Sequence, residues 1–483
     1  MNYLVTTSLP YVNGEPHIGF AMELIQADVL ARSARSLKKP VIFVTGTDEH
    51  GGKIAEKAAE TGLEPKAYTD KVSQSFRDIG KSLNLSNDRF IRTTDAGHEQ
   101  RAQLIWKALK KDIYKNNYTG WYCTGCEAYA TEAVVKENKG NCPLHNKPYE
   151  KIEEENYFFK LSGYAPKIKQ AITDGSFKII PATKKNEILN VINDGLEDIS
   201  ISRPKDKISW GIPVPGDDTQ VMYVWFEALM NYITVLGYPE HDDFKKFWPA
   251  NVQVIGKDIL RFHAAIWPGI LLGLGLQLPK TLYVHGFITV AGQKMSKTLG
   301  NVLHPQQIID EYGVDAFRYY FLRHIPSYED GDFNWDRLHA AYNNELANEL
   351  GNAVQRTAAM ITQYQKGVIG SMPEAEHDQA QYWEALERCH FDRALDEVWE
   401  QVRGLNQYID EAKPWEINKQ GDADHLREVL AYQCSCLLEI ATMLQPFMPD
   451  TADKINHVFK EGVVQPIEGT LFPRKDLPLR ADQ

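Results

Sequence analysis

The order of strand-like and helix-like segments near the start of the chain constrains its fold most. Residues 2–8 form an apolar run of strand length, 17–37 favour a helix, and 41–44 have the sequence Val-Ile-Phe-Val. A loop at 46–51 and a helical segment to about residue 58 follow. Strands that alternate with helices are typical of a parallel sheet covered by helices on both faces. The sequence therefore predicts an α/β fold with a doubly wound parallel sheet.

This pattern is interrupted after about residue 112 by a segment rich in Cys, Asn and Lys. Apolar strand-like runs return near 221–224 and 252–255, which indicates a nucleotide-binding domain split by an insertion. Beyond residue 332 the sequence favours long helices. One buried helix face is predicted from apolar residues at steps of three and four, namely Phe391, Leu395, Val398, Val402 and Leu405.

Charge and apolar patterning exclude some classes of protein. The net charge of −12 argues against general nucleic-acid binding, although local basic patches would suffice for a specific complex. The longest apolar run, 264–278, is broken by Pro268 and is too short to cross a bilayer. The N-terminus shows no export signal. We therefore expect a cytoplasmic protein that does not contact membranes.

Three cysteines and a histidine in the insertion have the spacing of a zinc knuckle. Two residues separate Cys123 from Cys126, two separate Cys142 from His145, and fifteen lie between the pairs. Three thiolates and one imidazole would fill a tetrahedral zinc shell and leave no position for water, so the predicted role is structural. A disulfide or unrelated thiols are the alternatives, and the lack of an export signal disfavours the disulfide.

Two short motifs, far apart in the chain, suggest a chemistry. Residues 16–20 have the sequence Pro-His-Ile-Gly-Phe at a predicted strand-to-helix junction, and 294–297 have the sequence Lys-Met-Ser-Lys between glycines. A chain with both motifs in this order resembles the class I aminoacyl-tRNA synthetases. In those enzymes a carboxylate attacks the α-phosphate of ATP, and the charge that develops must be met by donors from two directions.

The residue types of the two motifs suit that chemistry. Pro16 favours the first turn of a helix, whose N–H groups and dipole attract phosphate, and Gly19 allows close approach of the nucleotide. The lysines would act as point charges on the outer phosphates. The resemblance implies His17, Lys294 and Lys297 as catalytic residues. It implies that ATP, with Mg²⁺, is bound by His17, Gly19, Phe20, Gly256, Asp258, Lys294 and Lys297.

Five blocks in family order extend the resemblance to the methionyl-tRNA synthetases. They are 6–14, 45–51, 223–228, 256–259 with His263, and 294–297. The resemblance implies that methionine is activated to methionyl-adenylate and transferred to initiator and elongator tRNA. Phe20 departs from the family, which usually has a second histidine there. Three outcomes are open: a backbone donor or a nearby side chain replaces the contact of that histidine, adenylation is reduced, or ATP binds in a different pose.

The resemblance also implies a methionine site. Its residues are Leu9, Tyr11, Asp48, Trp225, Ala228, Tyr232, Ile259 and His263. Aromatic walls suit a flexible thioether, and a carboxylate such as that of Asp48 suits the substrate ammonium. Taken singly, Trp225 and His263 would more simply be core residues; the joint occurrence of the blocks favours the binding role.

A third group of residues is predicted to read the tRNA anticodon. Asn348, Asn352 and Arg356 follow one another at steps of four, hence on one helix face, and Pro414 and Trp415 follow another helix. The resemblance implies that Trp415 stacks on an anticodon base while the amides and the guanidinium meet base edges. The alternative is a solvated helix face with a tryptophan that closes the core.

The resemblance completes a domain map. We predict a Rossmann-like catalytic domain in two halves (1–112 and 211–290), a connective insertion with the zinc knuckle (113–210), a Lys-Met-Ser-Lys loop and stem-contact region (291–335), an α-helical anticodon-binding domain (336–465) and a tail (466–483). No extension of the kind that supplies dimer contacts in many relatives follows, so we expect a monomer.

Two other functional classes remain as alternatives. One is a nucleotidylyltransferase, which would lack the zinc insertion and the helical domain. The other is a non-catalytic tRNA-binding paralogue, which would have no need of Asp48 and both lysines.

Overall fold

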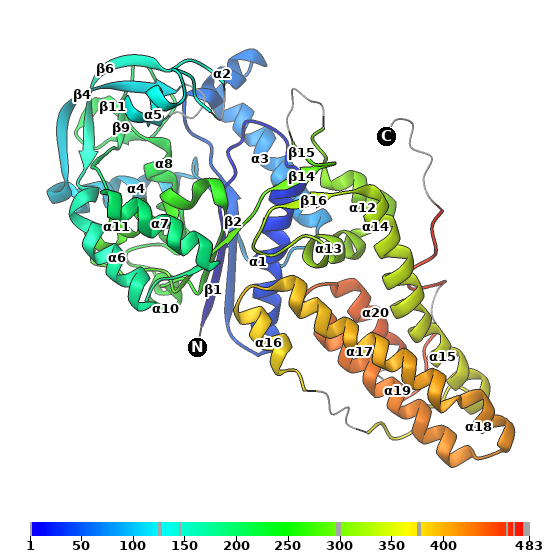
Figure 1. Cartoon of the computed structure of the whole chain (residues 1–483). Coiled ribbons are helices and arrows are strands. Elements are labelled where there is room, and N and C mark those ends of the chain that lie inside the picture. Colours follow the sequence, from blue (N-terminus) through cyan, green and yellow to red (C-terminus); the bar gives the residue numbers. More distant parts are fainter. Residues whose placement is uncertain are drawn as a thin grey trace.

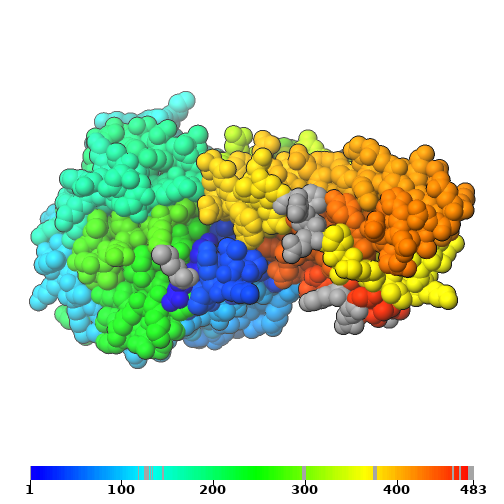
Figure 2. Space-filling view, turned by 90° about the horizontal axis from the view of Figure 1, so that it is seen from below, coloured from blue at the N-terminus to red at the C-terminus, as the bar shows by residue number. Residues whose placement is uncertain are grey.

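The computed structural model describes residues 2–123, 128–130, 132–143, 146–295, 301–373, 378–459, 462–466 and 469–476. An α/β domain occupies one end of an elongated molecule and a bundle of helices the other, as Figures 1 and 2 show. Among the helices of these residues, none is long and apolar enough to cross a membrane.

A six-stranded sheet organises the α/β domain, with the order β3-β2-β1-β12-β13-β7. Every neighbouring pair is parallel, which confirms the predicted parallel sheet. The strands are β1 (Tyr3–Thr7), β2 (Val41–Thr47), β3 (Arg89–Arg92), β7 (Lys178–Ile180), β12 (Val252–Gly256) and β13 (Thr281–His285). The helices that connect or cover them are α1 (Ile18–Ser36), α2 (Gly52–Glu60), α3 (Pro65–Ser82), α4 (Ala96–Ala108), α6 (Ala165–Asp174), α7 (Ala182–Asp194) and α11 (Trp267–Gly273).

Successive residues of the central strands face two different cores. Val5 and Phe43 pack in one core with α1, whereas Leu4, Ile42 and Val44 pack in the other with α4 and α11. Because side chains alternate across a strand, a strand covered on both faces must be apolar at every position. This explains the uninterrupted Val-Ile-Phe-Val run of β2.

The predicted insertion, 113–210, does not stay apart from the central sheet. Its β7 pairs with β13 at the sheet edge, so the central sheet includes a strand from inside this range. The run at 221–224, expected to rejoin the parallel sheet, instead ends β11 of a small antiparallel sheet, and a helix begins at Val224. An apolar run shows that a strand is buried, but not against which sheet.

The other elements between residues 110 and 266 complete the α/β domain. One sheet has the order β5-β4-β6-β8 and another β10-β11-β9. Their strands are β4 (Ile113–Cys123), β5 (Ala128–Ala130), β6 (Glu150–Phe159), β8 (Ile199–Ser200), β9 (Ser202–Pro204), β10 (Pro213–Val214) and β11 (Asp217–Met222). Short helices accompany them, namely η1 (Lys110–Asp112), α5 (Glu132–Glu137), η2 (Leu161–Tyr164), α8 (Val224–Ala228), α9 (Asn231–Thr234), α10 (Asp242–Phe247), η3 (Lys257–Ile259) and the π-helical turn η4 (Phe262–Ile266).

A linking region leads to the helical bundle. It contains the sheet β15-β14-β16 and two helices, with β14 (Ile288–Val290), β15 (Gln293–Lys294), β16 (Gly331–Phe333), α12 (Pro305–Tyr312) and α13 (Val314–Arg323). The bundle comprises α14 (Trp335–Ala341), the π-helical segment η5 (Tyr342–Gly351), α15 (Asn352–Gln365), α16 (Ala380–Glu387), α17 (Phe391–Ala412), α18 (Pro414–Gln420), α19 (Ala423–Leu444) and α20 (Pro449–Phe459). The five apolar residues predicted to share a helix face are all buried on α17, as expected.

Arg318 of α13 is fully buried where the two ends of the molecule meet. Its guanidinium pairs with Asp28 of α1 at 2.8 Å and donates to the carbonyls of Phe447 at 2.7 Å and Leu83 at 3.2 Å. Burial alone would raise the pKa of Asp28, but the charges of Arg318 and Arg32 outweigh it and hold that pKa below its usual value. One side chain therefore ties the first helix of the α/β domain to the bundle.

We predict that Arg318→Leu lowers the free energy of unfolding by ~3–5 kcal/mol, because it leaves the Asp28 carboxylate buried without its main counter-charge. Arg393→Leu is the matched control: its contact with Asp396 spans 3.7 Å between side chains that are 70% and 47% exposed, so its loss costs less than about 1 kcal/mol. Urea unfolding followed by tryptophan fluorescence checks both. Equal shifts of the two midpoints would contradict the role given to Arg318.

Candidate active site

The candidate site lies at the carboxyl edge of the central sheet, where β1 stands between β2 and β12. Connections leave β1 and β12 toward opposite sides at such a switch point, and the space between them is where doubly wound sheets bind ligands. The segment after β1 runs beside the loop after β2: the Asp48 N–H donates to the Pro10 carbonyl at 2.9 Å, and the Val12 N–H donates to the Asp48 carbonyl at 3.1 Å. The backbone thus places buried Asp48 beside Leu9 and Tyr11.

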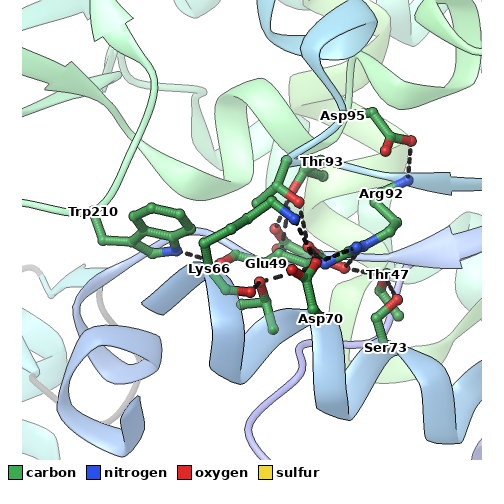
Figure 3. A network of polar contacts seen from close by, with 12 residues as sticks. Thr47, Glu49, Lys66, Asp70, Ser73, Arg92, Thr93, Asp95 and Trp210 are labelled. Atoms are coloured by element: carbon green, nitrogen blue, oxygen red, sulfur yellow. Dashed lines mark hydrogen bonds and ion pairs between the residues drawn. The ribbon is translucent and has the colours of Figure 1, made fainter. Parts of the chain in front are cut away.

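A network around Glu49 holds the loop that carries Asp48 (Figure 3). The buried Glu49 carboxylate accepts two bonds from the Arg92 guanidinium, both at 2.7 Å, and one from the Thr47 hydroxyl at 2.6 Å. The Glu49 N–H donates to the Thr93 hydroxyl, and the Trp210 indole donates to the Glu49 carbonyl at 2.7 Å. Because side chain and backbone of Glu49 are both bonded, the neighbouring Asp48 is held in place.

A second buried network follows directly in the same loop. His50 Nδ1 lies 2.9 Å from one oxygen of Glu227, and His98 Nε2 lies 2.9 Å from the other. Burial disfavours the charged imidazole, yet the hydrogen bond and the charge of Glu227 outweigh burial and raise the pKa of His50 to about 10. His50 is therefore a cation at neutral pH, paired with a carboxylate from α8.

The residues predicted to bind methionine gather on one side of this edge. Leu9, Tyr11, Trp225 and Ile259 are partly buried and pack against the core that contains Tyr232. The Trp225 ring stacks on Phe262 with centroids 4.2 Å apart. Ala228 is buried at the end of α8.

His263 lies in the π-helical turn η4, and such turns are frequent at functional sites. Its Nε2 is 2.7 Å from the Tyr232 hydroxyl, and its Nδ1 is 3.1 Å from the Ile259 carbonyl. Burial lowers the pKa of His263 to about 4, so the imidazole is neutral. A carbonyl only accepts, so Nδ1 carries the proton and Nε2 accepts from Tyr232.

A third buried acid, Glu23 of α1, was not predicted from the sequence. Its carboxylate accepts from the N–H of Ser8 at 2.7 Å and from the Ser8 hydroxyl at 2.6 Å, and it lies 3.0 Å from His285 Nε2. The hydrogen bond and charge of Glu23, with the charge of Asp258, outweigh burial and raise the pKa of His285. Burial raises the pKa of Asp258 above its usual value. The one signal in the sequence was a glutamate inside the apolar run of residues 21–25.

The start of α1 brings the two motifs together. His17 is the N-cap and accepts from the Gly19 N–H at 3.1 Å. A Cβ at Gly19 would lie 3.0 Å from the His17 ring and 3.8 Å from the Met295 methyl group, so the later motif reaches the first. Lys294 is exposed at the end of β15, in a hairpin whose turn residues Ala291 and Gly292 both have positive φ, as its two-residue loop requires. Lys297 lies outside the described residues.

Phe20 packs as an apolar residue. Its ring meets Phe76 of α3 edge to face, with centroids 5.3 Å apart, and it adjoins two core clusters. A phenyl ring offers no hydrogen-bond donor, so the contact expected of the family's histidine must come from another group.

Two of the predicted zinc ligands lie among the described residues. Cys123 ends β4 and Cys142 starts a tight turn, and both are buried. The described residues around Cys142 are mostly exposed, and those just before Cys123 are partly buried. The turn is closed by the Cys142 N–H, which donates to the Lys147 carbonyl, and by the Asn146 N–H, which donates to the Cys142 carbonyl, both at 2.8 Å. Cys126 and His145 lie outside the described residues.

Two of the predicted anticodon readers, Arg356 and Trp415, lie together on the bundle. Asn352 is exposed on α15, and Arg356 lies over the Trp415 ring at 5.8 Å while its guanidinium bonds to Asp410 at 2.9 Å. Pro414 is buried as the first residue of α18. Asn348, in η5, accepts a hydrogen bond from Arg474 of the tail. The structure thus groups Arg356 with Trp415 and pairs Asn348 with the tail.

Comparisons with known proteins cover both ends of the molecule. The family described as tRNA synthetases class I (M) matches residues 3–151 and 144–358, and the family described as the anticodon-binding domain of tRNA ligase matches residues 374–476. The methionine–tRNA ligase of Caldanaerobacter subterraneus subsp. tengcongensis is 42% identical over 94% of this chain and 73% of its own length. The methionine–tRNA ligase of Thermotoga maritima is 40% identical over 94% of this chain and 75% of its own length.

A solved structure is similar over nearly the whole chain. Mycobacterium tuberculosis methionyl-tRNA synthetase in complex with methionyl-adenylate has a TM-score of 0.91 and 34% sequence identity, with 98% of this chain and 100% of that chain covered. The similarity therefore includes the helical bundle as well as the sheet.

We predict opposite charge states for the two histidines that flank the site. His50 stays protonated at about pH 8, and its contribution to stability is lost only as the pH rises from about 6.5 toward 10. His263 stays neutral at about pH 5.5, and its contribution is lost as the pH falls from about 6.5 toward 4. Ring ¹⁵N spectra of labelled protein, assigned with His50→Gln and His263→Gln, measure both states. Two rings that titrate together near pH 6.5 would contradict the assignment.

Proposed function

This chain belongs to the methionyl-tRNA synthetases, a family of class I aminoacyl-tRNA synthetases, and on that premise we propose that it attaches methionine to its tRNA in two steps. In the first, a carboxylate oxygen of methionine attacks the α-phosphorus of ATP, the bond to the β-phosphate oxygen breaks, and pyrophosphate leaves. In the second, a hydroxyl of the terminal ribose of the tRNA attacks the methionyl carbonyl, and AMP leaves. One observation carries the proposal: the family matches extend over a switch-point site and an anticodon-binding domain in a single chain.

The methionine end of the site is assigned to the residues around Asp48 and His263. Buried Asp48 binds the substrate ammonium in a charge-assisted hydrogen bond. The Glu49 network holds the loop of Asp48 in position for this contact. Trp225, Tyr232 and the neutral His263 surround the thioether. A neutral, already bonded imidazole offers no charge that would favour a polar amino acid, so the pocket suits methionine.

The ATP end is assigned to the start of α1 and the segments that adjoin it. His17 and the positive end of the α1 dipole face the phosphates, Gly256 and Asp258 hold the nucleoside side, and Lys294 and Lys297 meet the outer phosphates. Phe20 contributes packing only. Mg²⁺ bound to ATP would neutralise part of the phosphate charge.

The insertion is assigned a structural zinc ion held by Cys123, Cys126, Cys142 and His145. The two described cysteines support this, since both are buried and Cys142 is so among mostly exposed residues, where thiolates with a shared metal would supply the missing core. Thiolates of this kind persist in a reducing compartment, so we propose a cytoplasmic location together with the zinc.

The bundle is assigned the reading of the anticodon, with Trp415 as the stacking platform and Arg356, Asn352 and Asn348 at base edges. The contact of Arg356 with the Trp415 ring supports a shared surface. Asn348 would exchange its bond with Arg474 for one with the tRNA.

We predict that Asp48→Asn raises the KM for methionine about 10- to 100-fold in methionine-dependent exchange of pyrophosphate into ATP, because the ammonium loses a hydrogen bond to a charged partner worth ~1.5–3 kcal/mol. The KM for ATP should change little. The control Asp78→Asn removes a carboxylate that is 56% exposed on α3. A variant at Asp48 with an unchanged KM for methionine would remove this residue from the site, and a parent protein without exchange activity would support the non-catalytic alternative.

We predict about one zinc ion per purified chain. Cys142→Ser should lose the metal, because a hydroxyl replaces one thiolate ligand, whereas Cys434→Ser, which changes a thiol buried in α19, should retain it. Elemental analysis of the three proteins measures this. Absence of zinc in the parent, or full occupancy in Cys142→Ser, would overturn the assignment.

A further inference from the structure

A cavity of about 250 Å³ lies between the end of α15, α18 and the start of α19. These elements form the tip of the bundle farthest from the central sheet (Figure 1). The cavity shares α15 with Arg356 and α18 with Trp415. Its residue Tyr364 follows Arg356 on α15 by eight positions, which is about 12 Å along a helix. The cavity therefore continues the surface assigned to the anticodon without coinciding with it.

The lining offers an aromatic face and amide groups. The Tyr364 ring is partly buried against the core, and Asn418 contributes a side-chain amide. The Nε2 of Gln365 is buried, and it has no hydrogen-bond partner among the described residues. An aromatic platform beside amides is the set of groups that proteins use to hold an unstacked nucleobase.

The charges at the cavity favour a base over a phosphate. Arg427 is present, but its guanidinium bonds to Asp424 at 2.8 Å, which uses one of its five donors. Asp422 lines the cavity as the N-cap of α19; one of its oxygens accepts from the His425 N–H at 3.2 Å. The Asp422 carboxylate, together with an arginine that is already paired, disfavours a phosphate in the cavity, whereas the N–H groups of a base can donate to a carboxylate.

The position of Arg427 depends on a glycine. A Cβ at Gly370 would lie 2.7 Å from the Arg427 Cγ, so only glycine allows the arginine stem to lie across the backbone there. The volume is below the range of about 300–1,000 Å³ found for small-molecule sites, which fits one base rather than a whole nucleotide.

We propose that this cavity takes an unpaired nucleobase of the anticodon loop of the tRNA, a different base from the one assigned to Trp415. The base stacks on Tyr364, an acceptor of the base receives an N–H of the exposed Asn418 amide, and a donor of the base meets Asp422. This inference rests on the proposed reading of the anticodon by the bundle and extends that reading to a second pocket.

The test uses the full chain and a transcript of methionine tRNA in which each anticodon-loop nucleotide is made abasic in turn. Dissociation constants are measured at one salt concentration for the parent, Tyr364→Leu and the matched Tyr364→Phe. Loss of one stacked base weakens binding roughly 5- to 150-fold. We expect that loss for Tyr364→Leu and for one abasic position, with no further loss when the two are combined, and near-parental binding for Tyr364→Phe.

The outcomes separate the pocket from the proposed function. Equal weakening of every transcript by Tyr364→Leu, with a lowered melting temperature, would mean structural damage and overturn the pocket. Unchanged binding by Tyr364→Leu would also overturn the pocket. If Trp415→Ala and altered anticodons still weaken binding in that case, the proposed reading of the anticodon by the bundle stands. If Trp415→Ala and altered anticodons have no effect either, the reading of the anticodon by the bundle fails as well.

Discussion

The pairing of β1 with β12 is the constraint on which the site depends. The register Val5↔Val252 to Thr7↔Val254 joins strands about 250 positions apart and creates the switch point at the centre of the sheet. Because both strands are parallel, their carboxyl ends meet at one edge, and the loops that follow carry Leu9 and Tyr11 from one half and Asp258 from the other. Without this pair, the two halves of the site would not share a surface.

Buried acids then hold each loop at that edge. Glu49 is bonded to Arg92, Glu227 to two histidines, and Glu23 to Ser8 and His285. A buried carboxylate that lost its partners would be costly, so each network allows few alternative positions of its loop. Burial of these carboxylates lowers the stability of the fold, and they lie where Asp48 and the start of α1 must be placed accurately. Arg318 plays the corresponding part between the α/β domain and the bundle.

The parts of the fold that local sequence determines were predicted well. The strand at 2–8, the helix after His17 and the buried face of α17 all follow from short-range patterns, and the structure confirms them. The strand β7 was missed because three residues are too few for a pattern, and its place depends on β13 a hundred positions later. The run at 221–224 was assigned to the wrong sheet, since apolar character does not specify a partner.

The site was predicted through motifs, and its supporting residues were not. Asp48, Tyr232 and His263 were assigned to the site because they lie in or beside recognisable blocks, and the structure brings Tyr232 and His263 into contact. Glu23 and His98 were missed because their partners, His285 and Glu227, lie 262 and 129 positions away. No local pattern encodes such pairs, and only the folded sheet brings them together.

In the proposed function, one edge of the central sheet binds methionine on the Asp48 side and ATP at the start of α1. A crystal structure of this chain with a non-hydrolysable sulfamoyl analogue of methionyl-adenylate tests it most directly. We expect the ammonium of the analogue to lie within hydrogen-bond distance of Asp48 and its thioether to contact Tyr232 and His263. The adenosine should lie beside Gly256. An ammonium bound away from Asp48, or a thioether outside the Trp225 pocket, would contradict it.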